Sequence, residues 1–281
     1  MPKRYFHYTS GKGLFGILTS NTLQCTNMKF LNDPSENIYI DSLLEELFVE
    51  NPSYRDVYNE LYNPTIEDGL FPYNYFVASF SRKQDSLHMW NYYASGNGYN
   101  IEINLDSIKE INKKDFDLIE KQDVIYDIEE QKRLLIELLE RYSEVFSDFL
   151  KEKQRHEDND YLKDLDYGEL LQIQIGFYSD IRKYRFHFKH MAYRHEEETR
   201  LIIGCDYREP NKKLKYKVTE SGVIIEYVEL NLNLTKNLKS ITIHPAASEL
   251  HLAGIKGYLL SKMNYFRNIN IKKSTVPFRN I

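Results

Sequence analysis

The segment that most constrains the fold is Tyr193–Ile203, in which a densely charged run leads directly into an apolar strand. Thr199–Ile203 is β-branched and apolar enough to form a buried strand, whereas the three residues before it are all glutamates. A carboxylate that leads into a buried strand is held on a rigid scaffold while it still faces a cleft, which suits catalysis. If the residues that lead into the strand already alternate as a strand does, the side chains of Glu196 and Glu198 share one face and that of Glu197 lies on the other.

Composition limits the classes of protein to be considered. With 281 residues, of which 42% are hydrophobic and 28% are charged, the chain is typical of a soluble globular protein with a substantial core. A net charge of −5 provides no overall attraction to a phosphate backbone. Cys25 and Cys205 are too few for a disulfide framework or a four-cysteine zinc site. The sequence has no 18-residue apolar run and no signal-peptide pattern, so we expect a cytoplasmic protein that does not contact a membrane.

Strand-like and helix-like patterns are mixed along the chain, and neither a linker nor an internal repeat divides them. The predicted strands are 5–9, 23–26, 76–81, 99–105, 123–126, 199–203, 214–218, 223–230, 238–243 and 269–271. The predicted helices are 10–20, 34–48, 53–62, 85–93 and 247–262, with two further charged helices within 129–190.

This order of elements predicts a single α+β domain over 1–281, with a mixed or antiparallel central sheet and flanking helices. The segment 129–190 is a helical insert within that domain. We expect the insert to pack beside the sheet, with Leu134, Leu138 and Ile173 facing inward.

Polar positions near the N-terminus are candidates for ligand binding. His7 and Thr9 lie on the strand 5–9, although a single histidine on a strand is more often structural. Asp33 precedes a proline as a helix-capping acid does, so it has a structural explanation, whereas Asn32 has none. An amide at the apex of a turn can bind a base or an amide group of a ligand.

A second group of candidates lies within 79–93. Ser81 precedes a helix that carries the single tryptophan and two adjacent tyrosines. Trp90 has the spacing of a packed residue, whereas Tyr92 and Tyr93 cannot both face the core, so one of them is available to a ligand.

The carboxylates also have a structural explanation. Arg200 continues the face of Glu196 and Glu198, so these residues can form a salt-bridged cluster. His187 and His190 are three residues apart rather than four as in the HExxH motif, and no Walker loop is present. We therefore expect no bound metal.

Six segments, taken together, resemble one family. They are Tyr5-x-His7-Tyr8-Thr9-Ser10, Gly16-Ile17-Leu18, Leu31-Asn32-Asp33-Pro34-x-Glu36, Ser79-Phe80-Ser81, Ser86-Leu87-x-Met89-Trp90-x-x-Tyr93-Ala94 and Glu196-x-Glu198-x-Arg200-Leu201-Ile202. Their order and their spread over most of the chain are similar to the bacterial domain-of-unknown-function family 2971 (DUF2971). The chain departs from that family at His195, where relatives usually have an aromatic residue, and at Thr199, where they often have tryptophan.

The layout also resembles, more remotely, the ADP-ribosyltransferase-like fold. In that fold a first-strand histidine contacts a ribose of NAD, an aromatic side chain covers nicotinamide, and a late glutamate binds a hydroxyl of the nicotinamide ribose. The resemblance implies that NAD is a substrate and that the reaction requires no metal. The implied catalytic residues are His7, Glu196 and Glu198, and the implied NAD-binding residues are His7, Tyr8, Thr9, Asn32, Ser81, Trp90, Tyr92, Tyr93 and Arg200. Glu198 has the role of the late glutamate, and Tyr92 or Tyr93 that of the aromatic cover.

The same resemblance implies an acceptor for the ADP-ribosyl group, which is a nucleic acid, a protein or a small molecule. Chains of this kind lie in mobile, defence-like gene settings. We therefore expect a toxin or an anti-phage defence effector, with a partner protein from the same operon.

Two other functions stay open. A metal-dependent nuclease or hydrolase could use Asp33, Glu36, Glu196 and Glu198, although an arginine stands where a nuclease E-x-K motif has lysine. A non-catalytic module could bind a nucleotide or a peptide in an aromatic cleft. Convergence of His7 and Glu198 on neighbouring strands in one cleft favours NAD chemistry, carboxylates without His7 favour a metal, and dispersed motifs favour a scaffold.

Overall fold

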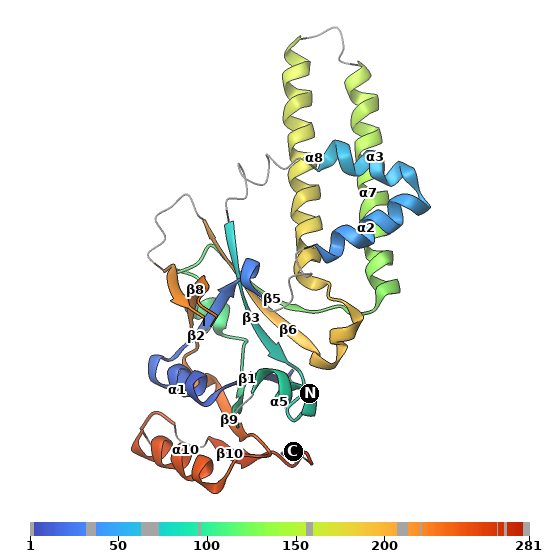
Figure 1. The fold of residues 1–281 in the computed structure, drawn as a ribbon. Coiled ribbons are helices and arrows are strands. Elements are labelled where there is room, and N and C mark those ends of the chain that lie inside the picture. The colour runs from blue at the N-terminus through green and yellow to red at the C-terminus, as the bar shows by residue number, and fades with distance from the viewer. Residues whose placement is uncertain are drawn as a thin grey trace.

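The computed structural model describes residues 3–31, 38–62, 73–94, 97–155, 160–206, 213–219, 221–262, 264–266 and 269–277, apart from the side chains of 155 and 160–166. Figure 1 shows two regions, a twisted sheet with short helices against it and a helical arm that projects from one side of the sheet. Each region has an apolar core of its own. The predicted combination of a mostly antiparallel sheet with flanking helices is confirmed.

The described strands form one ten-stranded sheet. They are β1 (Tyr5–Thr9), β2 (Thr22–Asn27), β3 (Tyr73–Ser81), β4 (Tyr99–Ile103), β5 (Leu118–Asp123), β6 (Glu198–Asp206), β7 (Lys215–Val218), β8 (Ile224–Asn231), β9 (Leu238–Ile243) and β10 (Asn270–Lys273). The order is β10-β9-β4-β1-β3-β2-β8-β7, and β6 pairs with both β3 and β5. The pairing of β10 with β9 is parallel, and the other strand pairs are antiparallel.

The centre of the sheet branches at β3. The whole of β3 pairs with β6, but on the other side β1 pairs with it at Ser81 and β2 pairs with it at Phe76 and Val77. The segment 78–80 therefore lies beside the gap in which β1 and β2 separate. This gap positions the candidate site.

Short helices lie against the sheet: α1 (Gly11–Ser20), η1 (Met28–Phe30), α5 (Leu87–Tyr93), α6 (Ile108–Asn112), η2 (Met191–Glu196), α9 (Leu234–Asn237) and α10 (Glu249–Ser261). α1 begins as the sequence predicts, because the Ser10 side chain accepts a hydrogen bond from the Gly13 N–H. Its Leu14, Ile17 and Leu18 are buried against the sheet. The apolar stripe therefore fixes which face of α1 meets the strands.

The arm consists of α2 (Tyr39–Glu50), α3 (Pro52–Leu61), α7 (Ile128–Arg155) and α8 (Asp160–His187). The two predicted helices of the insert are confirmed, and Leu134, Leu138 and Ile173 belong to their apolar cluster. The expectation that the insert packs beside the sheet is wrong, because α7 and α8 extend away from it and α2 and α3 cross them (Figure 1). An amphipathic stripe shows that a helix has a partner but does not identify it.

Two further predictions need correction. The predicted strand 123–126 is β5 at Leu118–Asp123, and Ile125 forms only an isolated parallel bridge with Phe188. The helix predicted at 34–48 is α2, which begins at Tyr39 after Ile38 as its N-cap and ends at Glu50. The predicted capping residues Asp33 and Pro34 lie outside the described residues. Within the described ranges, no helix has the length and apolar character needed to cross a membrane.

Candidate functional site

A cavity of about 470 Å³ opens where β1 and β2 separate along β3. Its lining comes from β1, β2, η1, β3, α5, β6 and the segment that joins α8 to β6. We call it the carboxylate cavity, because Glu196 and Glu198 both line it. The described part of its wall combines aromatic rings with a few charged groups, a mixture typical of small-molecule sites.

Two cations and two carboxylates form a buried cluster at the wall. Lys189 Nζ lies 2.7 Å from Glu196 Oε2 and 3.2 Å from Glu198 Oε2, so one ammonium group bridges the two acids. Arg200 donates from Nε to Glu198 Oε1 at 2.9 Å and from Nη2 to Glu198 Oε2 at 3.0 Å. All four side chains are almost inaccessible to solvent. Burial of this kind is tolerated only because the charges compensate each other.

Glu198 is fully occupied by these contacts. Burial alone would raise the pKa of Glu198, but Arg200, Lys189 and a hydrogen bond from Ser79 lower that pKa to about 2. The carboxylate accepts two hydrogen bonds from Arg200, one from Lys189 and one from Ser79. A carboxylate has about four lone-pair positions, so Glu198 has no vacant acceptor for a ligand.

Glu196 has more capacity. It ends η2, and its Oε1 accepts a hydrogen bond from the Tyr93 hydroxyl while Oε2 accepts one from Lys189. Burial raises the pKa of Tyr93, and the bond to Glu196 raises it further, so this hydroxyl stays protonated and donates. About two acceptor positions of Glu196 are left over. The main chain is fixed as well, because Ser81 Oγ donates to the Glu196 carbonyl at 2.6 Å.

Glu197 points out of the cavity. Its side chain is exposed and lies 3.1 Å from Lys83 Nζ. The sequence predicts that Glu196 and Glu198 share a side and that Glu197 does not, and this is confirmed. The expected cause is wrong, because no strand alternation extends back to Glu196. Instead, Glu197 adopts the left-handed conformation (φ 44°) between the 3₁₀ helix and β6.

His7 reaches the cavity from β1. Its Nδ1 lies 3.1 Å from the Ser79 carbonyl, so Nδ1 carries the hydrogen and donates it. Burial lowers the pKa of His7, which favours the neutral ring with its lone pair on Nε2. His7 and Glu198 line one cavity, as expected, and both bind Ser79. They do not lie on neighbouring strands, because β3 runs between β1 and β6.

Other predicted residues divide into three groups. Those that line the cavity are Tyr8, Ser81, Tyr92, Tyr93 and Arg200. Tyr92 is 71% exposed, whereas the Tyr8 hydroxyl is engaged with the main chain of Lys83 and Ser86. Thr9 and Trp90 do not belong to the lining, and Asn32, Asp33 and Glu36 lie outside the described residues.

Trp90 requires a correction. It is fully buried, its indole N–H donates to Asp85 at 2.7 Å, and its ring meets Tyr8 edge to face at 4.9 Å. Trp90 therefore supports the wall behind Tyr8 and does not contact a ligand in the cavity.

Lys189 is the main residue that the sequence does not identify. It follows α8, its ammonium lies 4.7 Å from the centre of the Tyr193 ring, and its carbonyl accepts from Gln131 at 3.1 Å. In the sequence it lies between two histidines, which draw attention to metal binding instead. No local pattern links a lysine to acids seven and nine positions later.

The donor set fits a divalent metal poorly. The bridging position between Glu196 and Glu198 is taken by the Lys189 ammonium. Among the described residues, no group of three or more histidine, cysteine, aspartate or glutamate side chains could hold a metal ion.

Residues 89–201 match the model of a family described as protein of unknown function (DUF2971). The match runs from α5 into β6, so it contains Tyr93, Lys189, Glu196, Glu198 and Arg200. This match confirms the resemblance to DUF2971 that the sequence motifs indicate. No curated protein and no solved structure matches the chain.

Proposed function

We propose that the chain is an ADP-ribosyltransferase-like enzyme that uses NAD as a substrate in the carboxylate cavity. The observation that carries the proposal is that one cavity is lined by side chains from β1, α5, the end of η2 and the start of β6, namely His7, Tyr92, Tyr93, Glu196 and Glu198. The sharing of one cavity by His7 and Glu198 supports NAD chemistry, although the two residues do not lie on the neighbouring strands that the sequence analysis expects. The volume of about 470 Å³ is also within the usual range of small-molecule sites.

The described lining suits one end of NAD better than the other. Tyr92 offers an exposed ring that can cover nicotinamide, and Glu196 and His7 Nε2 offer acceptors for ribose hydroxyls. The cationic side chains of Lys189 and Arg200, which line the cavity, already donate hydrogen bonds to Glu196 and Glu198. The nicotinamide–ribose end therefore fits the cavity, and the diphosphate gains no cation from it.

NAD supplies a bond between nicotinamide and ribose whose breakage leaves positive charge on the sugar. A fixed negative charge near that sugar stabilises the transition state more than the ground state. We assign this role to Glu196 rather than to Glu198, because Arg200 already neutralises Glu198 and occupies both of its oxygens. Glu198 instead anchors Lys189 and Arg200. Tyr93 and Lys189 hold the Glu196 carboxylate in one orientation.

Release of nicotinamide from NAD by the purified protein, with and without candidate nucleic acid or protein acceptors, tests the proposal. Glu196→Gln keeps the shape of the side chain but removes its charge. We expect it to slow nicotinamide release by about a hundredfold and to change NAD affinity much less. Glu197→Gln is the matched control, because that side chain is exposed, and it should release nicotinamide at the wild-type rate.

Tyr92→Ala is a second variant that leaves the fold intact, because its ring is 71% exposed. Loss of an aromatic cover should weaken NAD binding up to about tenfold. Equal rates for Glu196→Gln and Glu197→Gln, or no NAD binding by calorimetry, would refute the proposal. If turnover is found, arrest of growth on expression, relieved by Glu196→Gln, tests a toxin or antiviral defence role.

One observation favours a second function, a nucleotide-sensing module without catalysis. The four charges of the cluster balance, two positive against two negative, so the cluster as a whole presents no net negative charge to a ligand. Under this alternative NAD or a related nucleotide binds with measurable affinity but is recovered unchanged. The assay above separates binding from turnover.

A further inference from the structure

The C-terminal segment 270–277 ends beside the loop that leads into α5. β10 pairs in parallel with β9 at the end of the sheet opposite to the arm (Figure 1). Directly after β10, the Ser274 N–H donates to the Ile243 carbonyl at 2.9 Å. Three of the four β10 residues are exposed, so the strand buries little of its own surface. The contacts of Ser274 and Thr275 therefore matter for the position of the segment.

Asp85 joins this segment to α5. Ser274 Oγ donates to Asp85 Oδ1 at 2.6 Å, although the two residues are 189 positions apart, and the Thr275 N–H donates to Asp85 Oδ2 at 3.2 Å. The indole N–H of Trp90 donates to the same Oδ1 at 2.7 Å. One carboxylate thus binds both the C-terminal segment and α5. All three donors are neutral, and hydrogen bonds to an ionised acceptor are stronger than those between neutral groups.

Next to this junction α5 packs against β1. Trp90 is fully buried and meets the Tyr8 ring edge to face at 4.9 Å. The Tyr8 hydroxyl accepts a hydrogen bond from the Ser86 N–H at 3.2 Å and donates one to the Lys83 carbonyl at 3.0 Å. The main chain on both sides of Asp85 is therefore fixed to a central strand of the sheet.

α5 depends on such contacts for its position. It has seven residues, about two turns, and a helix this short is not stable by itself. Its N-cap residue, Ser86, makes no side-chain capping bond. Tyr93 lies three residues after Trp90, on the neighbouring turn, and its hydroxyl donates to Glu196 Oε1. A displacement of Trp90 therefore also moves the hydroxyl that binds Glu196.

We infer that Asp85 and Ser274 are positioning residues, which couple the C-terminal segment to α5 and so hold the Tyr93 hydroxyl against Glu196. Neither residue belongs to the described lining of the carboxylate cavity, so both act through α5. The coupling itself is a property of the fold. Its consequence for turnover rests on the proposed function, in which Glu196 stabilises the transition state and Tyr93 orients Glu196.

Ser274→Ala tests the coupling. It removes the donor to Asp85 and the acceptor of the Val276 N–H, whereas Thr275→Ala keeps the main-chain N–H that Asp85 binds and loses only an exposed side chain. Trp90 is the single tryptophan, so the chain has one indole N–H signal in an NMR spectrum. Its exchange in deuterium oxide should be about tenfold faster in Ser274→Ala, because a bond to a charged acceptor is lost, and unchanged in Thr275→Ala. Equal exchange in the two variants overturns the inference.

A double-mutant cycle tests whether the coupling reaches the cavity. Tyr93→Phe removes only the hydroxyl that binds Glu196, and we expect it to lower the Tm of the otherwise wild-type protein by about 4 °C. In the Ser274→Ala background Tyr93 is already less well placed, so the same substitution should lower the Tm by about half as much. In the Thr275→Ala background the full loss should remain. Equal losses in all three backgrounds mean that the C-terminal segment does not position Tyr93, and the inference is then wrong.

Nicotinamide release connects the coupling to catalysis. Ser274→Ala should lower kcat about tenfold and change KM less than about twofold, because the orientation of Glu196 matters most in the transition state. Thr275→Ala should keep both wild-type values. If the wild type releases no nicotinamide, the proposed function fails, while the exchange and Tm measurements still decide the coupling. If the wild type is active and Ser274→Ala has the same kcat, Ser274 and Asp85 have no positioning role in the reaction.

Discussion

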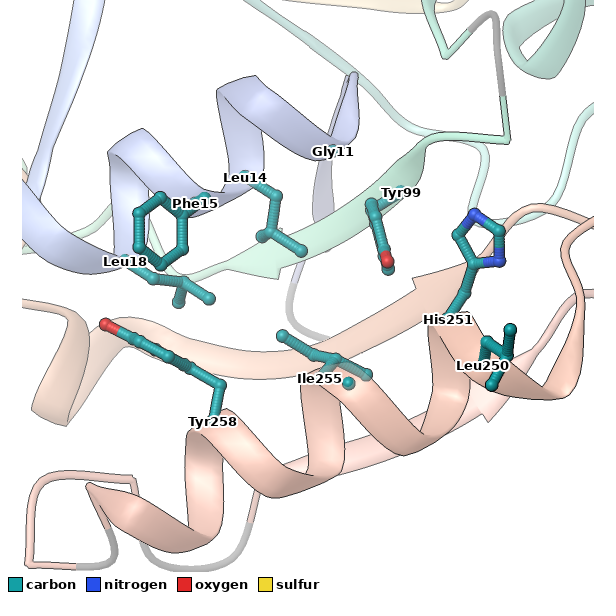
Figure 2. A pocket seen from close by; sticks show the side chains of 10 residues that line it. Gly11, Leu14, Phe15, Leu18, Tyr99, Leu250, His251, Ile255 and Tyr258 are labelled. Carbon is teal, nitrogen blue, oxygen red and sulfur yellow. The ribbon is translucent and has the colours of Figure 1, made fainter.

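The carboxylate cavity and a second cavity between α1 and α10, called the α1–α10 groove (Figure 2), have almost the same volume, about 470 and 450 Å³. Their walls are stabilised differently. The cavity wall contains four buried charges that compensate one another. The groove wall consists of apolar side chains from two helices, and part of their surface is exposed. A single change of charge should therefore disturb the cavity strongly, whereas the groove should tolerate polar substitutions. Cavity volume alone does not distinguish the two sites.

The largest effect is expected for Glu198→Gln. The substitution leaves Arg200 without its anionic partner in a position where Arg200 is 1% exposed. Breaking a buried pair in this way costs about 3–5 kcal/mol in the free energy of unfolding. Urea unfolding followed by circular dichroism measures it.

Glu197→Gln is the control for that measurement. Its ion pair with Lys83 is exposed on both sides, so the free energy of unfolding should change by less than about 0.5 kcal/mol. If Glu198→Gln is as mild as this control, the cavity wall does not depend on its charges and the comparison with the groove breaks down.

Acid should affect the cavity next most strongly. The folded-state pKa of Glu198 is about 2, below the ordinary value of 4.5. A depressed carboxyl pKa contributes stability that is complete above the ordinary pKa and is lost as pH falls toward the folded-state pKa. Between about pH 6 and about pH 3, the wild type should lose about 2 kcal/mol that Glu198→Gln has already lost. Unfolding curves of both proteins at the two pH values measure the difference, and parallel losses would contradict a low pKa for Glu198.

The smallest effect is expected for Leu250→Ser in the groove. With 81% of the side chain exposed, little apolar contact within the chain is lost. In dilute solution the free energy of unfolding should change by less than about 0.5 kcal/mol, and equally so at both pH values. A larger loss would mean that the groove is a packed part of the core, and the contrast between the two sites would disappear.

Parts of the molecule that depend on neighbouring residues could be predicted from the sequence. Ser10 caps α1, and the side chains of Leu14, Ile17 and Leu18 share one face, because capping and helical spacing act within a few residues. The contact of Glu198 with Arg200 also follows from strand alternation. The sequence therefore anticipates most strands, most helices and the salt-bridged face.

Parts that depend on distant segments could not be predicted. Lys189 meets Glu196 and Glu198 because the chain turns between α8 and β6, and no pattern announces that turn. Trp90 and Tyr92 are two residues apart on one short helix, yet one is buried and the other is exposed. Only the packing of α5 against Tyr8 decides which. The position of the arm likewise depends on α2 and α3, which lie far from α7 in the sequence.

The balanced charges of the cavity wall also affect how fast a ligand arrives. Lys189 and Arg200 cancel Glu196 and Glu198 over a short distance, so little field from this cluster remains beyond one Debye length, about 8 Å at physiological salt. Encounter with the cavity is then governed by free diffusion and by the fraction of collisions with a suitable orientation. Its association rate constant should change little with ionic strength, unlike that of sites that attract their ligands through a long-range field.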